Sequence, residues 1–471
     1  MPPQSPPILK NKEGETGMLP LKLREIAAAA HAECKTEIPD IEITDICTDS
    51  RDVQPGSLFV ALCGKQFDGH AFVKKAMENG AAFAVVQKDG DYGTDRLLYV
   101  KTTRQAFLDI AGLHRSRFHP KVIAVTGSVG KTTTREMAAA VVKSTYKTLK
   151  TENNLNNEVG VPKTLLELDE SYEAMVLEFG MVWPGEIREL TVPAKPDVSI
   201  VTCIGACHIE NLGSRENILK AKLEILEGLR PGGTLLLNQD NDLLRGLSFP
   251  QFHTLFYSTE DPFADIFAEG IVPSESSTSF TIVAKEGRFP AVIPCIGIHN
   301  VGNALAGWAA GVAIGVEPER AAAALAEFQA TGMRQKMIDW KGIRIVEDCY
   351  NANPESVRAA MKTLSEMPCR GRKIAVLGDM LELGVVAESC HLEAGREAAT
   401  AADLLFCQGP LAALIAQGAR EAGMAEVYYE TEKGPLAALL REKARPGDVI
   451  WMKASRGMKF EDITELLTME D

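Results

Sequence analysis

Short apolar runs, bounded by glycine, proline and polar residues, recur along the chain and are separated by segments with helical spacing. The clearest run covers residues 122–125 and is predicted to be a buried strand, and residues 136–142 have the pattern of a helix. Strands and helices that alternate at this spacing favour an α/β fold with parallel, doubly wound sheets. Ligands of such sheets bind at the carboxyl ends of the strands, so polar residues that follow predicted strands are candidates for a binding site.

The same pattern divides the chain into a tail and three predicted domains. Residues 1–17 are rich in Pro, Lys and Glu without periodicity, which indicates a disordered tail or a start site placed too early. The predicted domains cover residues 18–119, 120–331 and 332–471. Strands are predicted at 57–62, 83–87, 122–125, 174–179, 198–204, 234–238, 344–347, 373–377, 404–407, 426–429 and 448–452. Helices are predicted at 21–30, 71–79, 104–118, 136–142, 215–229 and 297–316.

Composition and charge narrow the class of protein. The net charge of −14 argues against nonspecific nucleic-acid binding, although local sites can still bind small anions. The longest apolar segment, residues 304–316, is too short to span a bilayer, so no membrane insertion is expected. The amino-terminal residues lack the apolar core of a signal peptide, and the scattered cysteines are expected to be reduced thiols. The sequence therefore predicts a cytoplasmic protein.

One group of residues comes near to the spacing of a zinc site. Cys203 lies near the end of the strand predicted at 198–204, and Cys207 and His208 follow that strand. A structural zinc site needs four ligands, and no second pair accompanies these three residues. A zinc site is therefore not expected.

The glycine-rich stretch 126–133 lies between a predicted strand and a predicted helix, an arrangement that suits a nucleotide triphosphate. Glycines let the backbone approach phosphates, and the helix N-terminus supplies a positive field. Lys131 would reach the β- and γ-phosphates, and the Thr132 hydroxyl would face Mg²⁺. The full pattern has a further glycine at the position of Val125, so an ordinary glycine turn is the alternative. The predicted ATP-binding residues here are Gly127, Ser128, Val129, Gly130, Lys131, Thr132 and Thr133.

Three more charged residues follow the loop in the central block. Glu178 ends a predicted strand, where a carboxylate is a natural Mg²⁺ ligand, although a capping or solvent-facing role is the alternative. His208 follows the next strand, and a lone histidine there is more often structural than catalytic. Lys222 lies on a helix with one apolar face, where a solvated surface charge is the default interpretation.

Two clusters rich in amide side chains are further candidates for a site. Residues 151–157 include Asn156 and Asn157, whose donors and acceptors suit an acyl or phosphate oxygen, unless they form a polar turn. Residues 348–356 follow a predicted strand and open a helix with Pro354 near its first turn. Helix capping explains one of the polar residues in this cluster rather than four.

Together these segments resemble the Mur ligase superfamily, which uses ATP to form amide bonds in peptidoglycan precursors. The resemblance covers residues 18–467 and includes the stretch 126–133 and the motif His299-Asn300-x-x-Asn303. The stretches 348–356 and 377–384 are similar to the branch that adds D-alanyl-D-alanine. The Asp-Asn-Pro-Arg motif of the diaminopimelate-adding branch is missing. Four short motifs in the first block resemble the uridine-nucleotide domain, namely Asp49-Ser50-Arg51, Pro55-Gly56, Phe59-Val60-Ala61-Leu62 and Asp68-Gly69-His70.

The resemblance implies a fold and a reaction. The fold would comprise a small α/β uridine-nucleotide domain, a central P-loop ATPase domain with a mostly parallel sheet, and a C-terminal Rossmann-like domain. The terminal carboxylate of UDP-N-acetylmuramoyl-tripeptide would attack the γ-phosphate of ATP and form an acyl phosphate. The amine of D-alanyl-D-alanine would then displace phosphate. A Mur-type ligase with another carboxylate or amine is one alternative, and a P-loop switch or motor is another.

The resemblance also assigns roles to residues. Lys131, His208 and Lys222 would be catalytic, with Thr132 and Glu178 at the first of two Mg²⁺ ions. His208 would take part in the second site, together with Lys222 carried as a CO₂-derived carbamate. Asn300 would contact adenine, and Arg334 and Asp348 would reach the nucleotide. Ser50, Arg51, Asn156 and Asn157 would bind the UDP substrate, and Tyr350, Asn351, Asn353, Lys453, Ser455 and Arg456 would lie near the amine substrate.

The chain departs from the family pattern at two places. Ala454 replaces a glycine in the motif Lys453-Ala454-Ser455-Arg456. Met181-Val182-Trp183 stand where a small residue, a polar residue and His or Arg are usual, so polar groups near the acyl site are either missing or replaced by an apolar wall. The sequence leaves open whether the tripeptide ends in lysine or diaminopimelate, and a monomer is expected.

Overall fold

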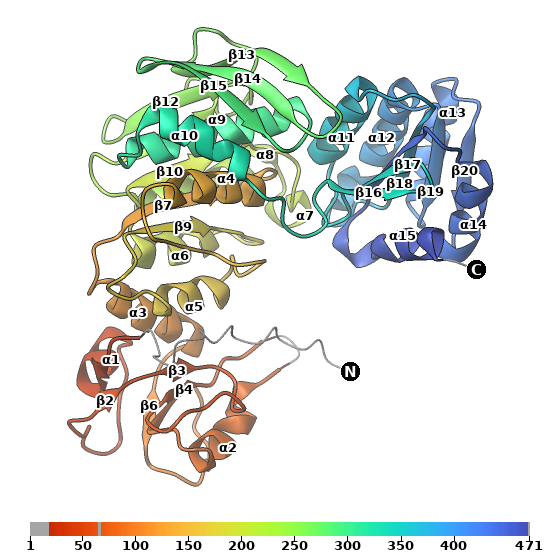
Figure 1. Ribbon diagram of the computed structural model, residues 1–471. Coiled ribbons are helices and arrows are strands. Elements are labelled where there is room, and N and C mark those ends of the chain that lie inside the picture. The colour runs from red at the N-terminus through yellow and green to blue at the C-terminus, as the bar shows by residue number, and fades with distance from the viewer. Residues whose placement is uncertain (1–17, 65–66, 470–471) are drawn as a thin grey trace. The chain divides into compact units, whose positions relative to one another are not determined.

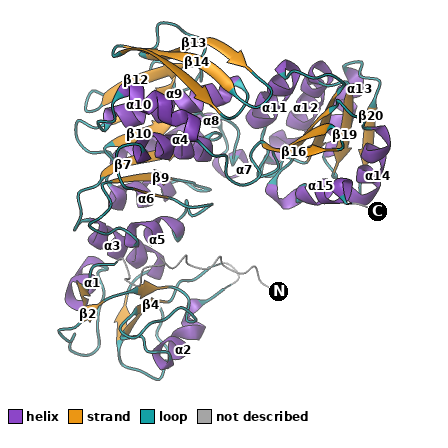
Figure 2. Cartoon of the chain, viewed as in Figure 1, coloured by secondary structure: helices purple, strands orange, loops and turns teal. Residues whose placement is uncertain are grey.

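The computed structural model describes residues 18–64 and 67–469, so the tail expected at 1–17 lies outside the described residues. The chain forms two compact units. Of the described residues, the first unit contains those from 18 to 120 and the segment 154–173, which falls inside the range predicted for the central domain. The second unit contains residues 121–153 and 174–469. The expected α/β class with sheets of mostly parallel strands is confirmed (Figure 2). The exact domain boundaries stay a prediction.

The first unit is built on a small parallel sheet of order β3-β4-β5-β6. Helix α5 packs against α3, and His114 Nε2 lies 2.8 Å from the Leu168 carbonyl oxygen. The strands are β1 (Leu21–Lys22), β2 (Glu42–Ile43), β3 (Ile46–Cys47), β4 (Leu58–Val60), β5 (Phe83–Val86) and β6 (Leu97–Tyr99). The helices are α1 (Leu23–Ala29), η1 (Gly69–Phe72), α2 (Val73–Glu78), α3 (Thr103–Arg115) and α5 (Gly160–Leu166).

The central sheet of the second unit has the order β15-β14-β13-β12-β11-β10-β7-β9-β8. The strands from β8 to β13 pair in parallel, whereas β13, β14 and β15 form an antiparallel meander at one edge. The strands are β7 (Lys121–Thr126), β8 (Thr148–Lys150), β9 (Ala174–Glu178), β10 (Val198–Val201), β11 (Thr234–Asn238), β12 (His253–Ser258), β13 (Ile266–Pro273), β14 (Thr278–Ala284) and β15 (Gly287–Ile293).

Helices cover both faces of this central sheet. Helices α4 and α9 pack together on one face, and α6 lies across the sheet from α4 (Figure 1). A Cβ atom on Gly307 would lie 2.9 Å from the Ala138 nitrogen, so glycine permits the close approach of α9 to α4. The helices are α4 (Lys131–Lys143), α6 (Glu186–Ala194), α7 (Ile209–Leu212), α8 (Arg215–Leu223), η2 (Glu224–Glu227), α9 (Ile298–Ala313), α10 (Pro318–Ala324) and η3 (Leu325–Glu327).

The C-terminal sheet is doubly wound, with the order β16-β17-β21-β18-β19-β20. Alternate residues of β18 point to opposite cores: Ala375 and Leu377 pack with α11, α12 and α13, whereas Ile374 and Val376 pack with α14 and α15. The strands are β16 (Lys336–Trp340), β17 (Ile343–Glu347), β18 (Lys373–Gly378), β19 (Leu404–Gln408), β20 (Val427–Glu430) and β21 (Val449–Lys453). The helices are α11 (Pro354–Glu366), η4 (Gly384–Val386), α12 (Ala387–Ala401), α13 (Ala412–Glu421), α14 (Lys433–Lys443), η5 (Arg456–Met458) and α15 (Glu461–Thr468).

The predicted strands and helices are all present, with bounds that shift by up to three residues at most ends. The helix predicted at 215–229 ends as an α-helix at Leu223 and continues as the 3₁₀ turn η2. The elements that the pattern did not predict include β12 to β15 and the edge strand β16. Within the described residues, no helix has both the length and the apolar character needed to cross a membrane.

Candidate active site

The glycine loop lies between β7 and α4, as the sequence predicts. Gly127 and Gly130 both have positive φ values, of 148° and 85°. A Cβ atom on Gly127 would overlap the Thr202 hydroxyl, and one on Gly130 would lie 2.6 Å from Asn303 Oδ1. Lys131 Nζ donates to the Gly127 carbonyl oxygen at 2.8 Å, so its ammonium group lies over the loop. The loop therefore has the shape and charge that bind phosphates.

A buried carboxylate stands beside this loop. Strand β7 lies between β9 and β10, and Val125 is paired with Glu178, the last residue of β9. The Thr132 hydroxyl donates to Glu178 Oε2 at 2.8 Å, and Glu178 is only 1% exposed. Hydroxyl and carboxylate oxygens are the ligands that Mg²⁺ prefers. The donor set and its position beside the loop therefore fit a magnesium ion.

His208 and Lys222 lie on the segments that follow β10. His208 precedes α7 with a left-handed φ of 62°, and its Nδ1 lies 2.7 Å from Glu382 Oε2. Lys222 on α8 is 1% exposed. Burial and the repulsion of Lys131 lower the pKa of Lys222 to about 7. The effect of Lys131 on this pKa shows that the charge of the glycine loop acts on Lys222, although the two residues are far apart in the sequence.

Helix α9 contributes amide side chains beside Gly130 of the loop. Asn300 Oδ1 accepts from Asn303 Nδ2 at 3.1 Å, and the Thr134 hydroxyl donates to Asn303 Oδ1 at 3.1 Å. This chain of hydrogen bonds ties the first turns of α9 to α4. Asn300 is 5% exposed and donates to the Ile296 carbonyl oxygen, which fixes its orientation.

Around the C-terminal sheet, two residues that are expected to bind the nucleotide contact residues that are expected to lie near the amine substrate. Lys453 Nζ lies 2.7 Å from Asp348 Oδ2 and 3.1 Å from the Asn351 carbonyl oxygen. The Arg334 guanidinium lies 4.0 Å from the centre of the Tyr350 ring, which is a cation–π contact.

Three other residues of that region have contacts that explain their local structure. Asn353 accepts from the Ser356 backbone amide at 2.9 Å and forms a capping box at the start of α11. The Ser455 hydroxyl donates to the Ala352 carbonyl oxygen, and Arg456 forms an ion pair with Glu461. The polar residue that capping accounts for is therefore Asn353.

Family models match three parts of this chain. They are described as Mur ligase family, catalytic domain (residues 42–143), Mur ligase middle domain (125–311) and Mur ligase, glutamate ligase domain (333–456). The chain belongs to the Mur ligase family.

Relatives and solved structures agree with the family models. The UDP-N-acetylmuramoyl-tripeptide--D-alanyl-D-alanine ligase of Bacillus subtilis (strain 168) is 40% identical, over 90% of this chain and 93% of the relative. The enzyme of that name from Escherichia coli (strain K12) is 38% identical, over 78% of this chain and 80% of the relative.

A crystal structure of MurF from Acinetobacter baumannii has a TM-score of 0.88 at 30% identity, and covers 96% of this chain and 100% of its own. A MurF ligase of Thermotoga maritima, solved in complex with ADP, has a TM-score of 0.82 at 28% identity, and covers 90% of this chain and 97% of its own.

The residues that the family resemblance implies for the UDP substrate are placed in the first unit. Ser50 is buried, and its carbonyl oxygen accepts from Asn79 Nδ2 at 2.7 Å. Arg51 forms a two-pronged ion pair with Asp49, which lowers the pKa of that carboxyl group. Asn157 Oδ1 accepts from the Gly160 amide at the start of α5, and Asn156 lies next to it in the same unit.

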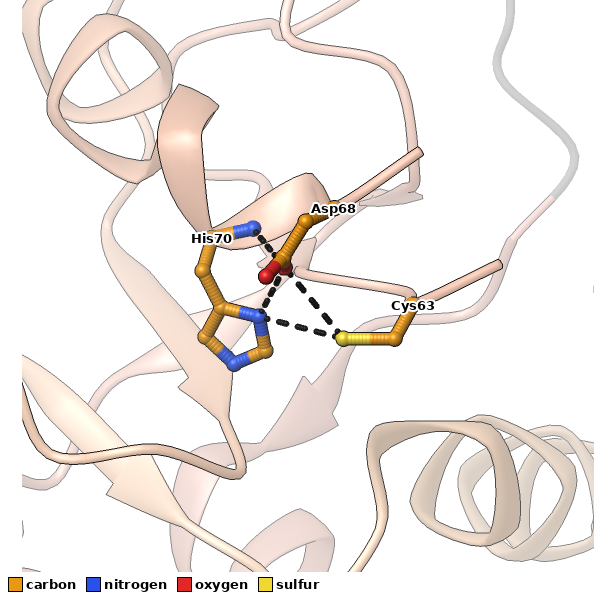
Figure 3. A group of neighbouring side chains, drawn as sticks. All are labelled: Cys63, Asp68 and His70. Atoms are coloured by element: carbon orange, nitrogen blue, oxygen red, sulfur yellow. Dashed lines mark hydrogen bonds and ion pairs between the residues drawn. The ribbon is translucent and has the colours of Figure 1, made fainter. Parts of the chain in front are cut away.

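One group of three described residues in the first unit is close enough to hold a metal ion: Cys63, Asp68 and His70 (Figure 3). His70 Nε2 accepts from the Gln87 backbone amide at 3.0 Å, so the ring proton must lie on Nδ1. Nδ1 then donates to Asp68 Oδ1 at 2.7 Å and has no lone pair to offer a cation. The cluster is a hydrogen-bonded connection between Asp68 and Gln87, the residue that follows β5.

The Met181-Val182-Trp183 departure forms a turn before α6. The backbone amides of Val182 and Trp183 donate to Glu186 Oε2 at 2.7 and 3.2 Å. Met181 is buried, and Trp183 is half exposed. Pro184, the next residue, lines a pocket of about 620 Å³ that also contacts Lys220 and Ala221 of α8. Lys222 lies off the helix face that lines this pocket, so the pocket is separate from the lysine's buried site.

Two residues of the site were not found from the sequence. Arg135 on α4 is fully buried and donates to Glu178 Oε2 at 3.2 Å. Thr202 lies under Gly127, and its hydroxyl donates to the Thr126 carbonyl oxygen at 3.3 Å. Both follow ordinary apolar or helical patterns, and only the three-dimensional neighbourhood distinguishes them.

Proposed function

We propose that this chain is an ATP-dependent ligase that joins D-alanyl-D-alanine to UDP-N-acetylmuramoyl-tripeptide and releases ADP and phosphate. The observation that carries the proposal is the buried pair of Thr132 and Glu178 beside a phosphate-binding loop. The substrates are proposed from the names of the two relatives that are 40% and 38% identical to this chain.

The reaction proceeds in two steps. A carboxylate oxygen of the tripeptide forms a bond to the γ-phosphorus of ATP, and the bond from that phosphorus to the oxygen of ADP breaks. The amine of D-alanyl-D-alanine then attacks the acyl carbon, the bond from that carbon to the phosphate oxygen breaks, and the amine loses a proton. Activation is necessary because a carboxylate is a poor electrophile at neutral pH.

The chain's own groups hold the phosphates during the first step. The ammonium group of Lys131 stabilises the negative charge of the transferring phosphoryl group, and the backbone amides at the start of α4 contribute a second positive region. Thr132 and Glu178 are the proposed ligands of one Mg²⁺, which when bound neutralises phosphate charge. His208 and a carbamate on Lys222 are proposed for a second Mg²⁺.

Lys222 is suited to carry such a carbamate. Its amine nitrogen must be neutral to form a bond to the carbon of CO₂, and that nitrogen then loses a proton. Burial and the nearby Lys131 lower the pKa of Lys222 to about 7, so a large fraction is neutral at physiological pH. The product is an anion, which replaces the repulsion between the Lys131 and Lys222 cations by an attraction.

The remaining site residues are proposed by resemblance. Asn300 contacts adenine, with Arg334 and Asp348 at the nucleotide. The UDP substrate is bound by Ser50, Arg51, Asn156 and Asn157, and the amine substrate by Tyr350, Asn351, Asn353, Lys453, Ser455 and Arg456. We also propose that the protein acts as a monomer in the cytoplasm, where its ten cysteines, all unpaired, stay reduced.

Substrate omission tests the function. With ATP, Mg²⁺ and both peptide substrates present, we expect steady release of phosphate, and omission of either peptide substrate should abolish that release. ATP turnover that does not depend on D-alanyl-D-alanine would refute the ligase.

A Mur-type ligase with a different amine or carboxylate is the second candidate. The apolar residues Val182 and Trp183 favour it, because they stand where polar residues are usual. Phosphate release with another dipeptide, at a rate above that with D-alanyl-D-alanine, would select this candidate.

A further inference from the structure

A buried arginine that the proposed reaction does not use lies beside the magnesium pair. Arg135 is on α4, one helical turn after Lys131, and its side chain is 0% exposed. A guanidinium keeps its proton at every physiological pH, and a buried charge is strongly unfavourable unless hydrogen-bonded acceptors surround it. The acceptors around Arg135 therefore indicate what its charge does.

The guanidinium contacts three acceptors at once. Nη1 donates to Glu178 Oε2 at 3.2 Å and to the Asn153 carbonyl oxygen at 3.0 Å, while Nη2 donates to Glu136. Glu136 is shared with Lys150, whose Nζ lies 2.7 Å from Glu136 Oε2. Lys150 also pairs with Glu152 at 3.7 Å, so Lys150 supplies a second cation to this group of carboxylates, and Glu178 has a cationic partner in Arg135 before any metal binds.

These contacts also fix where the Glu178 carboxylate lies. Arg135 Nη1 and the Thr132 hydroxyl both donate to the same oxygen, Oε2. The Glu178 backbone amide donates to the Thr151 hydroxyl at 3.1 Å, which anchors the end of β9. A carboxylate held by two donors at one oxygen, on an anchored backbone, keeps one orientation.

We propose that Arg135 is the positioning residue of the magnesium site, because its planar guanidinium holds the Glu178 carboxylate in one orientation for the cation. The inference rests on the proposed function, in which Glu178 is a Mg²⁺ ligand. A lysine cannot reproduce the fork, because an ammonium at this place cannot reach all three acceptors in one plane. Arg135→Lys therefore keeps the charge and removes the geometry.

The test measures metal binding directly rather than activity. Mn²⁺, which replaces Mg²⁺ and is visible by electron paramagnetic resonance, is titrated into the protein in the presence of ADP. We expect Arg135→Lys to raise the Mn²⁺ dissociation constant by about 10-fold or more, the usual effect of losing a partner of a metal ligand.

Arg230→Lys is the matched control. Arg230 pairs with Asp197 at 2.7 Å, just before the amino end of β10, whereas Glu178 lies at the carboxyl end of the parallel strand β9. We expect this variant to bind Mn²⁺ as the parent does. Thermal unfolding of the same samples shows whether any change in binding merely follows a loss of stability.

Glu178→Gln separates failure of this inference from failure of the proposed function. If Glu178→Gln leaves Mn²⁺ binding unchanged, the proposed metal role of Glu178 fails, and the inference fails with it. If Glu178→Gln weakens binding but Arg135→Lys binds within twofold of the parent, the inference alone is overturned, and Arg135 serves packing.

The parent protein gives a second measurement that does not depend on a folded variant. Bound Mn²⁺ with ADP should broaden the nuclear magnetic resonance signals of the Arg135 guanidinium, because the cation and the guanidinium share Glu178. Signals that stay sharp at saturating Mn²⁺ would overturn the inference.

Discussion

Replacement of Lys222 by alanine gives the most detailed test of the second metal site. Lys222 is 1% exposed, and the positive charge of Lys131 acts on its amine. With a pKa of about 7, about half of the amine is neutral at pH 7, against about 1 in 3,000 for a lysine at its ordinary value. The buried site thus raises the fraction of amine that can react with CO₂ by roughly a thousandfold.

We expect Lys222→Ala to lower kcat by about 100-fold or more, the scale seen when one electrostatic group leaves a reacting site. Removal of the lysine side chain leaves a cavity that a short carboxylate such as acetate can enter. Acetate should therefore restore part of the activity. Lys220→Ala is the matched control, because Lys220 lies on the same helix and is exposed. This control should keep its activity and show no response to acetate.

The pH dependence gives the sign of the effect. The amine must be neutral, so the parent should lose activity as the pH falls through about 7, where Lys222 becomes protonated. The alanine variant with acetate should lack this loss, because acetate stays ionised well below that pH. Full activity of Lys222→Ala without added carboxylate, or a pH profile unchanged in the rescued variant, would refute the carbamate.

Other predictions test the loop and the stability of two connections. Gly127→Ala should abolish ATP binding measured by calorimetry, because its Cβ atom would overlap the Thr202 hydroxyl; binding at parental affinity would contradict the loop geometry. Asn353→Ala should lower the free energy of unfolding by about 1 kcal/mol in urea, through loss of the capping box, whereas no change would show that the box contributes nothing. His70→Ala should lower the free energy of unfolding by about 1–3 kcal/mol, because the Gln87 amide loses its acceptor. Zn²⁺ should not raise the unfolding temperature of the parent protein, because the Nδ1 proton leaves His70 no lone pair for a cation; a rise would contradict that proton position.

The sequence predicted the parts of the fold that repeat a strong pattern. The strand β7, the glycine loop and the helix after it follow from an apolar run, two glycines and a helical segment, although α4 starts at Lys131 rather than at the predicted residue 136. Strands β17, β18, β19 and β21 of the C-terminal sheet are mostly buried, so they appear as nearly continuous apolar runs that are easily recognised.

The antiparallel edge of the central sheet was missed for a physical reason. In β14, Thr278, Phe280 and Ile282 are buried, while Ser279 between them is exposed. Such an alternating strand contains only a few apolar residues, so it resembles a loop unless the period of two is sought. The pattern was present in the sequence, but its period differs from that of the buried parallel strands.

The site was predicted residue by residue, whereas its connections were not. Glu178, His208 and Lys222 each had an ordinary structural explanation. The register of β9 and β7 places Glu178 beside the loop, whereas His208 lies on the segment between β10 and α7. Arg135 could not be found, because a charged residue on a helix is usually solvated. Its role depends on the burial of α4 against β9, which no local pattern reports.

The central claim is that the tripeptide carboxylate is activated as an acyl phosphate. The most direct test uses UDP-N-acetylmuramoyl-tripeptide with both oxygens of the terminal carboxylate labelled with ¹⁸O, together with ATP, Mg²⁺ and D-alanyl-D-alanine. Mass spectrometry should find one ¹⁸O atom in the released phosphate and the other in the new amide. Phosphate that contains no ¹⁸O would contradict the account, because the carboxylate would not have been phosphorylated.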